Sequence, residues 1–227
     1  MTAKLLDQLR ALHLPAFREG FEEAARQAIQ ETLSYEQYLL ELTNRECDSR
    51  RTRRIDRMLK DSCLPLEKTW SSFEQKRLTM KLSRQFRTLL EGGFLDRREN
   101  VLAFGNSGSG KSHLLCALGQ ELIRQQERSV YFSPCCLLVQ ELLVGKRDLK
   151  LSRVLKRLSK FDVVIVDDIG YVQQSRDEME VLFTLLAERY ERGSVMLTSN
   201  LPFSKWESIF KDPLTTDGQN QHRERQA

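Results

Sequence analysis

A cluster of glycine and serine between two apolar segments constrains the fold of this 227-residue chain most strongly. Residues 105–112 read GNSGSGKS and directly follow the apolar run 101–104. Glycine lowers the stability of any regular element, so such a cluster needs a reason. The spacing G-x-x-x-x-G-K-S is that of a phosphate-binding loop, whose backbone N–H groups converge on phosphate oxygens. A flexible linker is the alternative, but the complete pattern between a strand and a helix favours phosphate binding.

The loop and the start of the next helix are expected to bind the phosphates of a nucleotide. Lys111 should reach the β- and γ-phosphates, and the Ser112 hydroxyl should ligate Mg²⁺. The helix that follows adds N–H groups that favour an anion. The expected nucleotide-binding residues are Gly105, Asn106, Ser107, Gly108, Ser109, Gly110, Lys111, Ser112 and His113.

Two further polar groups follow apolar runs that are typical of buried strands. Asp167 and Asp168 come after the run 163–166, which predicts Asp167 as a Mg²⁺ ligand and Asp168 as the group that polarises the attacking water. Asn200 follows a fourth predicted strand and could bind the water or the γ-phosphate. The candidate catalytic residues are therefore Lys111, Asp168 and Asn200, and the candidate metal ligands are Ser112 and Asp167. An acidic pair at the start of a loop is the alternative interpretation of Asp167 and Asp168.

From residue 100 onward, predicted strands alternate with predicted helices. The strands are 101–104, 129–133, 161–166 and 194–198, and the intervening helices include 137–144, 151–158 and 178–191. This alternation predicts an α/β fold, with a parallel sheet flanked by helices. The almost wholly apolar third strand is typical of a parallel strand buried on both faces.

The first hundred residues predict an all-α region instead. Apolar residues recur at helical spacing, Ser34 begins a capping box, and a further helix is expected over 75–90 with Gly92 and Gly93 as its stop. The expected organisation is a helical DNA-binding domain, a connecting basic helix and linker, an ATPase domain and a polar tail. Their ranges are 1–66, 67–99, 100–216 and 217–227.

Charge is distributed unevenly along the chain. Residues 45–87 carry thirteen basic and six acidic side chains, a net charge of +7, whereas residues 1–44 carry four basic and seven acidic side chains, a net charge of −3. A basic block of this kind indicates contact with the phosphates of duplex DNA, without base-specific readout. A solvated helix face is the alternative. The candidate DNA-binding residues are Arg50, Arg51, Arg53, Arg54, Arg57, Lys81 and Arg84.

Cysteine usage and hydropathy limit where the protein is expected to act. The five cysteines are an odd number without a C-x-x-C pair, which indicates free thiols in a reducing cytoplasm. No segment approaches the ~20 apolar residues of a membrane span. We therefore expect a cytoplasmic protein without a membrane partner.

Three longer segments carry a family resemblance. GNSGSGKSHL, VVIVDDIGY and RYERGSVMLTSNLPFSKWESIF resemble the IstB-like ATP-binding proteins, AAA+ helper ATPases that are encoded beside a transposase in bacterial insertion sequences and are similar to DnaC-type helicase loaders. The resemblance implies a P-loop AAA+ fold, ATP and Mg²⁺, homo-oligomeric assembly on duplex DNA and assistance to a cognate transposase. It makes 105–112 the Walker A segment, Asp167 and Asp168 Walker B, and Asn200 sensor 1. Many AAA+ proteins have Glu at the position of Asp168, where the shorter side chain withdraws the carboxylate by about one methylene, and this difference is expected to be tolerated.

Other functions and the C-terminal sequence qualify this expectation. A helicase loader and a nucleotide-gated DNA-binding module without turnover are the alternative functions. Beyond Leu214 the only apolar residue is Ala227, so a disordered tail is expected. The resemblance implies a further helix, an arginine-finger segment and a final strand that the sequence here does not match. This difference predicts a truncated or altered C-terminus and weak ATP hydrolysis.

Overall fold

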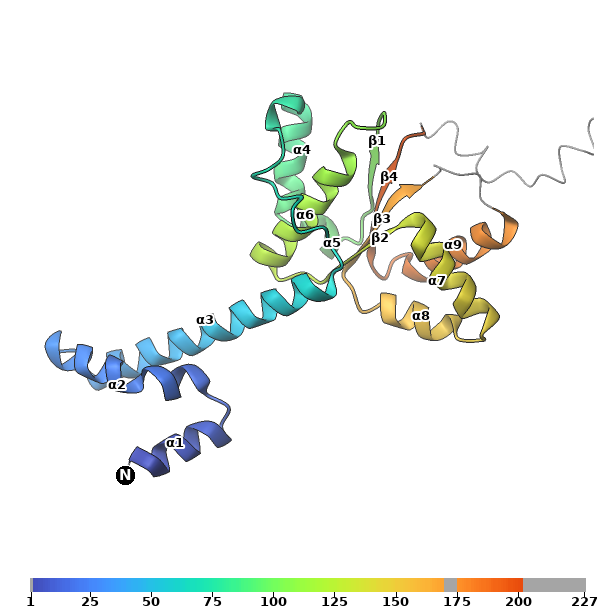
Figure 1. The fold of residues 1–227 in the computed structure, drawn as a ribbon. Helices are drawn as coiled ribbons and strands as arrows, with labels where there is room; N and C mark the ends of the chain where they lie inside the picture. Colours follow the sequence, from blue (N-terminus) through green and yellow to red (C-terminus); the bar gives the residue numbers. More distant parts are fainter. Residues whose placement is uncertain (1, 170–174, 202–227) are drawn as a thin grey trace, which may run out of the picture. The chain divides into compact units, whose positions relative to one another are not determined.

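The computed structural model describes residues 2–169 and 175–201. The chain divides into two compact units, 1–57 and 58–227 (Figure 1). The predicted boundary at residue 66 stays a prediction. The predicted tail over 217–227, and the expectations for the C-terminal segment from residue 202 onward, lie outside the described residues.

Helices predicted by apolar spacing build the first unit. They are α1 (Thr2–Ala11), α2 (Pro15–Gln30) and α3 (Tyr35–Asp61), the last of which continues into the second unit. Proline stands in the first turn of α2, where its missing N–H costs nothing. Ser34 and Gln37 exchange side-chain and backbone hydrogen bonds before α3, which confirms the predicted capping box.

A buried carboxylate joins the helices of the first unit. Glu46 on α3 accepts hydrogen bonds from the backbone N–H of Ala16 at 2.8 Å and from Nε of Arg50 at 2.7 Å. Arg50 also donates to the carbonyl of His13 at 2.8 Å. Burial acts to raise the pKa of Glu46, but these hydrogen bonds and the Arg50 charge lower it below its usual value. Arg50 therefore holds α3 against the turn between α1 and α2.

A parallel sheet forms the centre of the second unit. The strands are β1 (Val101–Phe104), β2 (Val130–Pro134), β3 (Val163–Ile169) and β4 (Ser194–Ser199), and they lie in the order β1-β4-β3-β2. Every pairing is parallel, as the alternation of strands and helices predicts. The four residues Val163–Val166 are fully buried, which confirms β3 as a central strand.

Helices cover both faces of this sheet. Among the described residues they are α4 (Met80–Leu90), α5 (Gly93–Asp96), α6 (Lys111–Gln126), α7 (Cys135–Arg147), α8 (Leu151–Leu158) and α9 (Arg176–Arg189), with a short 3-10 turn η1 (Gln75–Arg77). In Figure 1, α4 and α6 lie on one face, and α7, α8 and α9 lie on the other. Val164 and Val166 pack against α7, α8 and α9, and the alternate residue Ile165 lies against α6.

The helix predicted over 75–90 differs from the prediction at its start. Residues Gln75–Arg77 form the 3-10 turn, and α4 begins only at Met80, because Thr79 caps it by accepting a hydrogen bond from the N–H of Leu82. The predicted stop is confirmed, since Gly92 follows α4 in the left-handed region with φ +74°. On α4, Leu82 is 46% exposed beside a cavity.

A buried arginine connects the amino-terminal ends of β3 and β4. Arg189 on α9 donates to the carbonyl oxygens of Leu158, Phe161, Asp162 and Ser194 at 2.9 to 3.2 Å. Burial lowers the pKa of Arg189 to about 10, so the guanidinium remains charged at neutral pH. These bonds tie the end of α8, the start of β3 and the start of β4 together.

Candidate nucleotide-binding site

The strand order brings the predicted nucleotide-binding elements to one edge of the sheet. Phe104 at the end of β1 pairs with Ser199 on β4, and Ser199 also pairs with Ile169 on β3. The carboxyl ends of these three strands therefore lie side by side, which is where α/β proteins bind ligands. The loop 105–110, the acidic pair and Asn200 all follow or end these strands.

The loop after β1 has the backbone that its sequence predicts. Gly108 and Gly110 adopt φ +75° and +90°, a region that residues with a Cβ rarely enter. The ammonium of Lys111 lies across the loop and donates to the carbonyls of Gly105 at 2.8 Å and Asn106 at 2.9 Å. α6 begins at Lys111, directly after the loop. The first N–H groups of a helix have no partner within the helix, so this end of α6 favours an anion bound by the loop.

The acidic pair lies on an irregular part of β3. The register between β3 and β4 shifts between Val166 and Ile169, which places a bulge at Asp167 and Asp168. Asp167 is buried, whereas Asp168 is exposed and adopts φ +61°. The bulge thus points two neighbouring carboxylates into different surroundings.

A threonine that the sequence analysis gave no role holds this pair in place. The buried hydroxyl of Thr198 donates to Oδ1 of Asp167 at 2.5 Å and accepts from the backbone N–H of Asp168 at 2.7 Å. Its only sequence signal is a hydroxyl residue two positions before Asn200 on the neighbouring strand. Thr198 therefore fixes both the side chain of Asp167 and the backbone of Asp168.

Asn200 follows β4 directly and carries an unused acceptor. Its side-chain Oδ1 is buried and has no hydrogen-bond partner among residues 2–169 and 175–201. Buried polar atoms in native proteins are almost always paired, so a lone acceptor at this edge can take a hydrogen bond from a water molecule or a ligand. This arrangement fits the predicted role.

An aromatic segment before α4 anchors the helix that carries the loop. His113 on α6 contacts the carbonyl of Thr69 through Nε2 at 2.9 Å, and Phe73 packs edge-on to its ring with centroids 5.2 Å apart. Trp70 stacks between Phe73 and Phe86, at 5.9 and 4.2 Å. The ring of His113 is thus engaged by protein, and its predicted contribution to phosphate binding rests on its backbone N–H.

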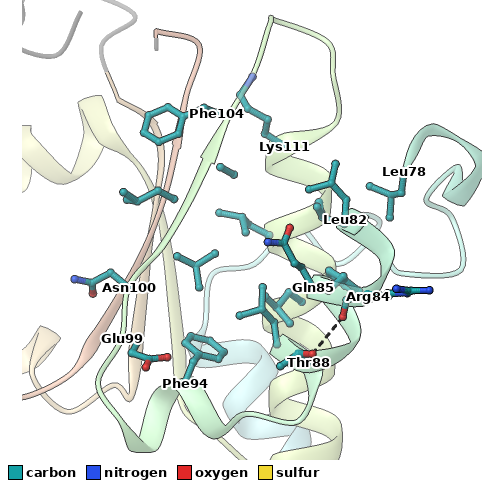
Figure 2. A pocket seen from close by; sticks show the side chains of 18 of the residues that line it. Leu78, Leu82, Arg84, Gln85, Thr88, Phe94, Glu99, Asn100, Phe104 and Lys111 are labelled. Atoms are coloured by element: carbon teal, nitrogen blue, oxygen red, sulfur yellow. Dashed lines mark hydrogen bonds between the residues drawn. The ribbon is translucent and has the colours of Figure 1, made fainter. Parts of the chain in front are cut away.

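A cavity of about 980 Å³ extends from the loop along β1. Its walls come from α4, β1 and α6 and are mainly apolar, and the partly exposed Phe104 and Lys111 lie at the end nearest the loop (Figure 2). Arg84 points away from β1 in the same view. No local sequence signal marks this cavity, because its walls are far apart in sequence.

The predicted DNA-binding residues are distributed over both units. Arg53 and Arg57 are exposed on α3, as are Arg51 and Arg54, which also make other contacts. Arg50 is half-exposed and holds Glu46. Lys81 and Arg84 are exposed on α4 in the second unit. Contact of these residues with DNA stays a prediction.

The described side chains suit a magnesium ion that is held partly by phosphate. Over residues 2–169 and 175–201, no three His, Cys, Asp or Glu side chains group as a metal centre made by protein alone. Mg²⁺ in nucleotide sites commonly takes one or two protein ligands and completes its shell with phosphate and water. The carboxylate of Asp167 and the Ser112 hydroxyl are of the required oxygen type.

In the part of the chain that the structure describes, no helix combines the length and the apolarity that crossing a membrane requires.

Comparison with known proteins places most of the chain in one family. The family model for IstB-like ATP binding proteins matches residues 7–219. A putative insertion sequence ATP-binding protein of Sinorhizobium fredii is 38% identical over 215 residues, which are 94% of this chain and 72% of that protein. The putative ATP-binding protein of insertion sequence IS21 from Pseudomonas aeruginosa is 36% identical over 211 residues, 92% and 77% of the two chains.

Solved structures show the same fold at low sequence identity. AMPPCP-bound DnaA from Aquifex aeolicus is similar with a TM-score of 0.53 and 18% identity, over 70% of this chain and 49% of DnaA. The DnaC helicase loader is similar with a TM-score of 0.50 and 20% identity, over 58% of this chain and 78% of the loader. With its P-loop AAA+ fold, the chain belongs to the family of IstB-like ATP-binding proteins.

Proposed function

We propose that this protein is an ATP-hydrolysing helper of DNA transposition, which assembles on duplex DNA and assists a cognate transposase. The observation that carries the proposal is the meeting of the phosphate-binding loop, the Asp167–Asp168 pair and Asn200 at one edge of the sheet. Relatives named as insertion sequence ATP-binding proteins support the link to transposition.

In this proposal each group at the sheet edge has one task. The loop and the start of α6 bind the phosphates of ATP, and Lys111 exchanges loop carbonyls for phosphate oxygens. Ser112 and Asp167 would hold Mg²⁺, which would supply positive charge near the phosphates. Asp168 accepts a proton from the attacking water, and Asn200 orients that water.

Two substitutions and a matched control test the nucleotide site. Lys111→Ala should weaken ATP binding by roughly 10- to 100-fold, because it removes a charge-assisted contact of about 1.5–3 kcal/mol. Asp168→Asn should retain binding and lose about 100-fold or more in turnover. Asp177→Asn, an exposed carboxylate that pairs with Lys146 on the surface, is the control and should change neither.

Nucleotide binding by filter assay and steady-state hydrolysis, with and without duplex DNA, give the readouts. Unchanged ATP binding by the Lys111 variant would contradict the assignment of the loop. A wild-type protein that binds ATP but shows no turnover under any condition would support a nucleotide-gated DNA-binding module instead. Pull-down with the cognate transposase and with a replicative helicase separates a transposition helper from a helicase loader.

In this proposal the basic residues of α3 and α4 contact the phosphate backbone of DNA. Neutralising Arg51, Arg53, Arg54 and Arg57 together should weaken duplex binding and reduce its dependence on salt, equally on two unrelated sequences. Arg50 is kept in this variant because it also holds Glu46. An unchanged salt dependence would mean that these arginines form an ordinary solvated helix face and do not contact DNA.

A further inference from the structure

A second basic segment lies in the ATPase unit, outside the sequence range 45–87 of the first charge block. Residues 146–160 carry seven basic side chains and one acidic side chain, a net charge of +6, which exceeds the +4 of the whole chain. The basic residues are Lys146, Arg147, Lys150, Arg153, Lys156, Arg157 and Lys160. The segment covers the end of α7 and all of α8.

The fold separates the apolar and basic residues of α8. Its apolar residues Leu151, Val154, Leu155 and Leu158 recur at helical spacing and pack against the core beside α7 and β3. The basic residues that alternate with them are exposed. Packing of α8 therefore forces its positive charges to one solvent-facing side.

Three of the seven basic residues are engaged by neighbouring groups. Arg157 forms two hydrogen bonds with Glu141, at 2.7 and 2.8 Å, and lies over the ring of Tyr131. Lys146 pairs with Asp177 and Glu180 on α9, and Arg147 pairs with Asp148 next to it. These contacts give Arg157 and Lys146 structural roles.

The other four basic residues form what we call the α8 basic face: Lys150, Arg153, Lys156 and Lys160. None of them has an ion-pair partner among the residues that the structure describes. Like charges three or four positions apart repel one another, so this row lowers stability unless an anionic partner meets it. An anionic partner would remove this repulsion.

We propose that the α8 basic face contacts the phosphate backbone of duplex DNA and is a second DNA-binding surface of this protein. The proposal rests on the proposed function, which makes duplex DNA the polyanion. Arg153 and Lys156 lie on α8, and Lys150 and Lys160 lie within two residues of its ends. The eight residues of α8 extend over about 12 Å, which matches three to four phosphates of one DNA strand at about 3.4 Å of axial rise each. The face carries only long basic side chains without base-reading groups, so it binds without sequence preference.

The test is a fourfold variant of the full chain with a matched control. Lys150→Gln, Arg153→Gln, Lys156→Gln and Lys160→Gln are combined in one protein. The control combines Arg97→Gln, Arg124→Gln, Arg128→Gln and Arg192→Gln, four arginines of the same unit that are already ion-paired. Both proteins lose four positive charges, so a general change of net charge affects them alike.

Binding to a fluorescent 30-base-pair duplex is measured by anisotropy across a salt series, in the presence of a non-hydrolysable ATP analogue. The α8 variant should bind at least tenfold more weakly, with a salt slope lower by about 3 to 4, because each lost phosphate contact lowers the slope by about 0.9. The control should keep the wild-type slope. Nucleotide binding by both variants reports that the ATPase unit is folded.

The outcomes separate this inference from the proposed function. A slope for the α8 variant that equals the slope of the control overturns the α8 surface, while wild-type binding to DNA leaves the proposed function standing. A wild-type protein that does not bind duplex DNA at all overturns both.

Discussion

Thr198→Val tests whether the Asp167–Asp168 pair acts as the structure arranges it. The substitution keeps the shape of the side chain and removes one hydroxyl, which donates to Oδ1 of Asp167 and accepts from the N–H of Asp168. A hydrogen bond to a charged group contributes about 1.5–3 kcal/mol and a neutral one about 0.5–1.5 kcal/mol. The expected loss in free energy of unfolding is therefore about 2–4 kcal/mol.

Hydrolysis should respond more strongly than nucleotide binding. The loop and Lys111 do not depend on Thr198, so ATP affinity should stay within about threefold of wild type. The carboxylates lose their fixed positions, and misplacement by about 1 Å can cost roughly 100-fold in rate. Urea unfolding, ATP binding by filter assay and steady-state turnover measure the three quantities.

Two further variants make this result interpretable. Thr198→Ser keeps the hydroxyl and should recover most of the turnover. Thr184→Val removes a hydroxyl that donates to the carbonyl of Glu180 one turn earlier in α9, and it should leave turnover unchanged. Wild-type turnover by Thr198→Val would refute the argument that this hydroxyl positions the acidic pair.

Two other predictions concern stability. Gly108→Ala should lower the free energy of unfolding by about 1–2 kcal/mol, because only the backbone angle at this position is unfavourable for alanine. Gly110→Ala should lower it by about 1 kcal/mol more, because the added Cβ would lie 3.0 Å from the ring of Phe73. Equal unfolding midpoints would refute the contact. Hydrogen bonds lower the folded-state pKa of Glu46, so its stabilisation is complete above the unfolded pKa and is lost as pH falls through the folded pKa. Unfolding of Glu46→Gln at pH 7 and pH 4 should therefore depend less on pH than that of wild type, and an equal dependence would refute this.

Local signals in the sequence predict the elements of the fold well. The run 163–166 predicts a strand buried on both faces, and all four residues are fully buried. Ser34 and Gln37 predict the start of α3, and Gly92 predicts the end of α4. In each case the cause lies within a few residues of the element, so the sequence alone contains it.

The rest of the site depends on contacts between distant residues. Thr198 on β4 forms a hydrogen bond with Asp167 on the neighbouring strand β3. The carbonyl of Thr69 contacts the ring of His113, which lies 44 positions later in the sequence. Nothing in the neighbouring sequence of Thr198 or Thr69 distinguishes it from an ordinary threonine. The predicted start of α4 at residue 75 was also wrong. The apolar spacing continues across Thr79, but the cap at Thr79 decides where the helix begins.

The backbone at Asp168 gives a physical reason for aspartate at a position where glutamate is expected. Asp168 has φ +61° within a bulge, a conformation that aspartate tolerates better than glutamate, and its N–H is held by Thr198. The bulge moves the main chain itself, so the reach of the carboxylate depends on the backbone as well as on side-chain length. Asp168→Glu should therefore destabilise this turn and hydrolyse ATP no faster than wild type, as measured by urea unfolding and steady-state turnover. A tenfold gain in turnover would mean that side-chain length, and not the bulged backbone, limits the reaction.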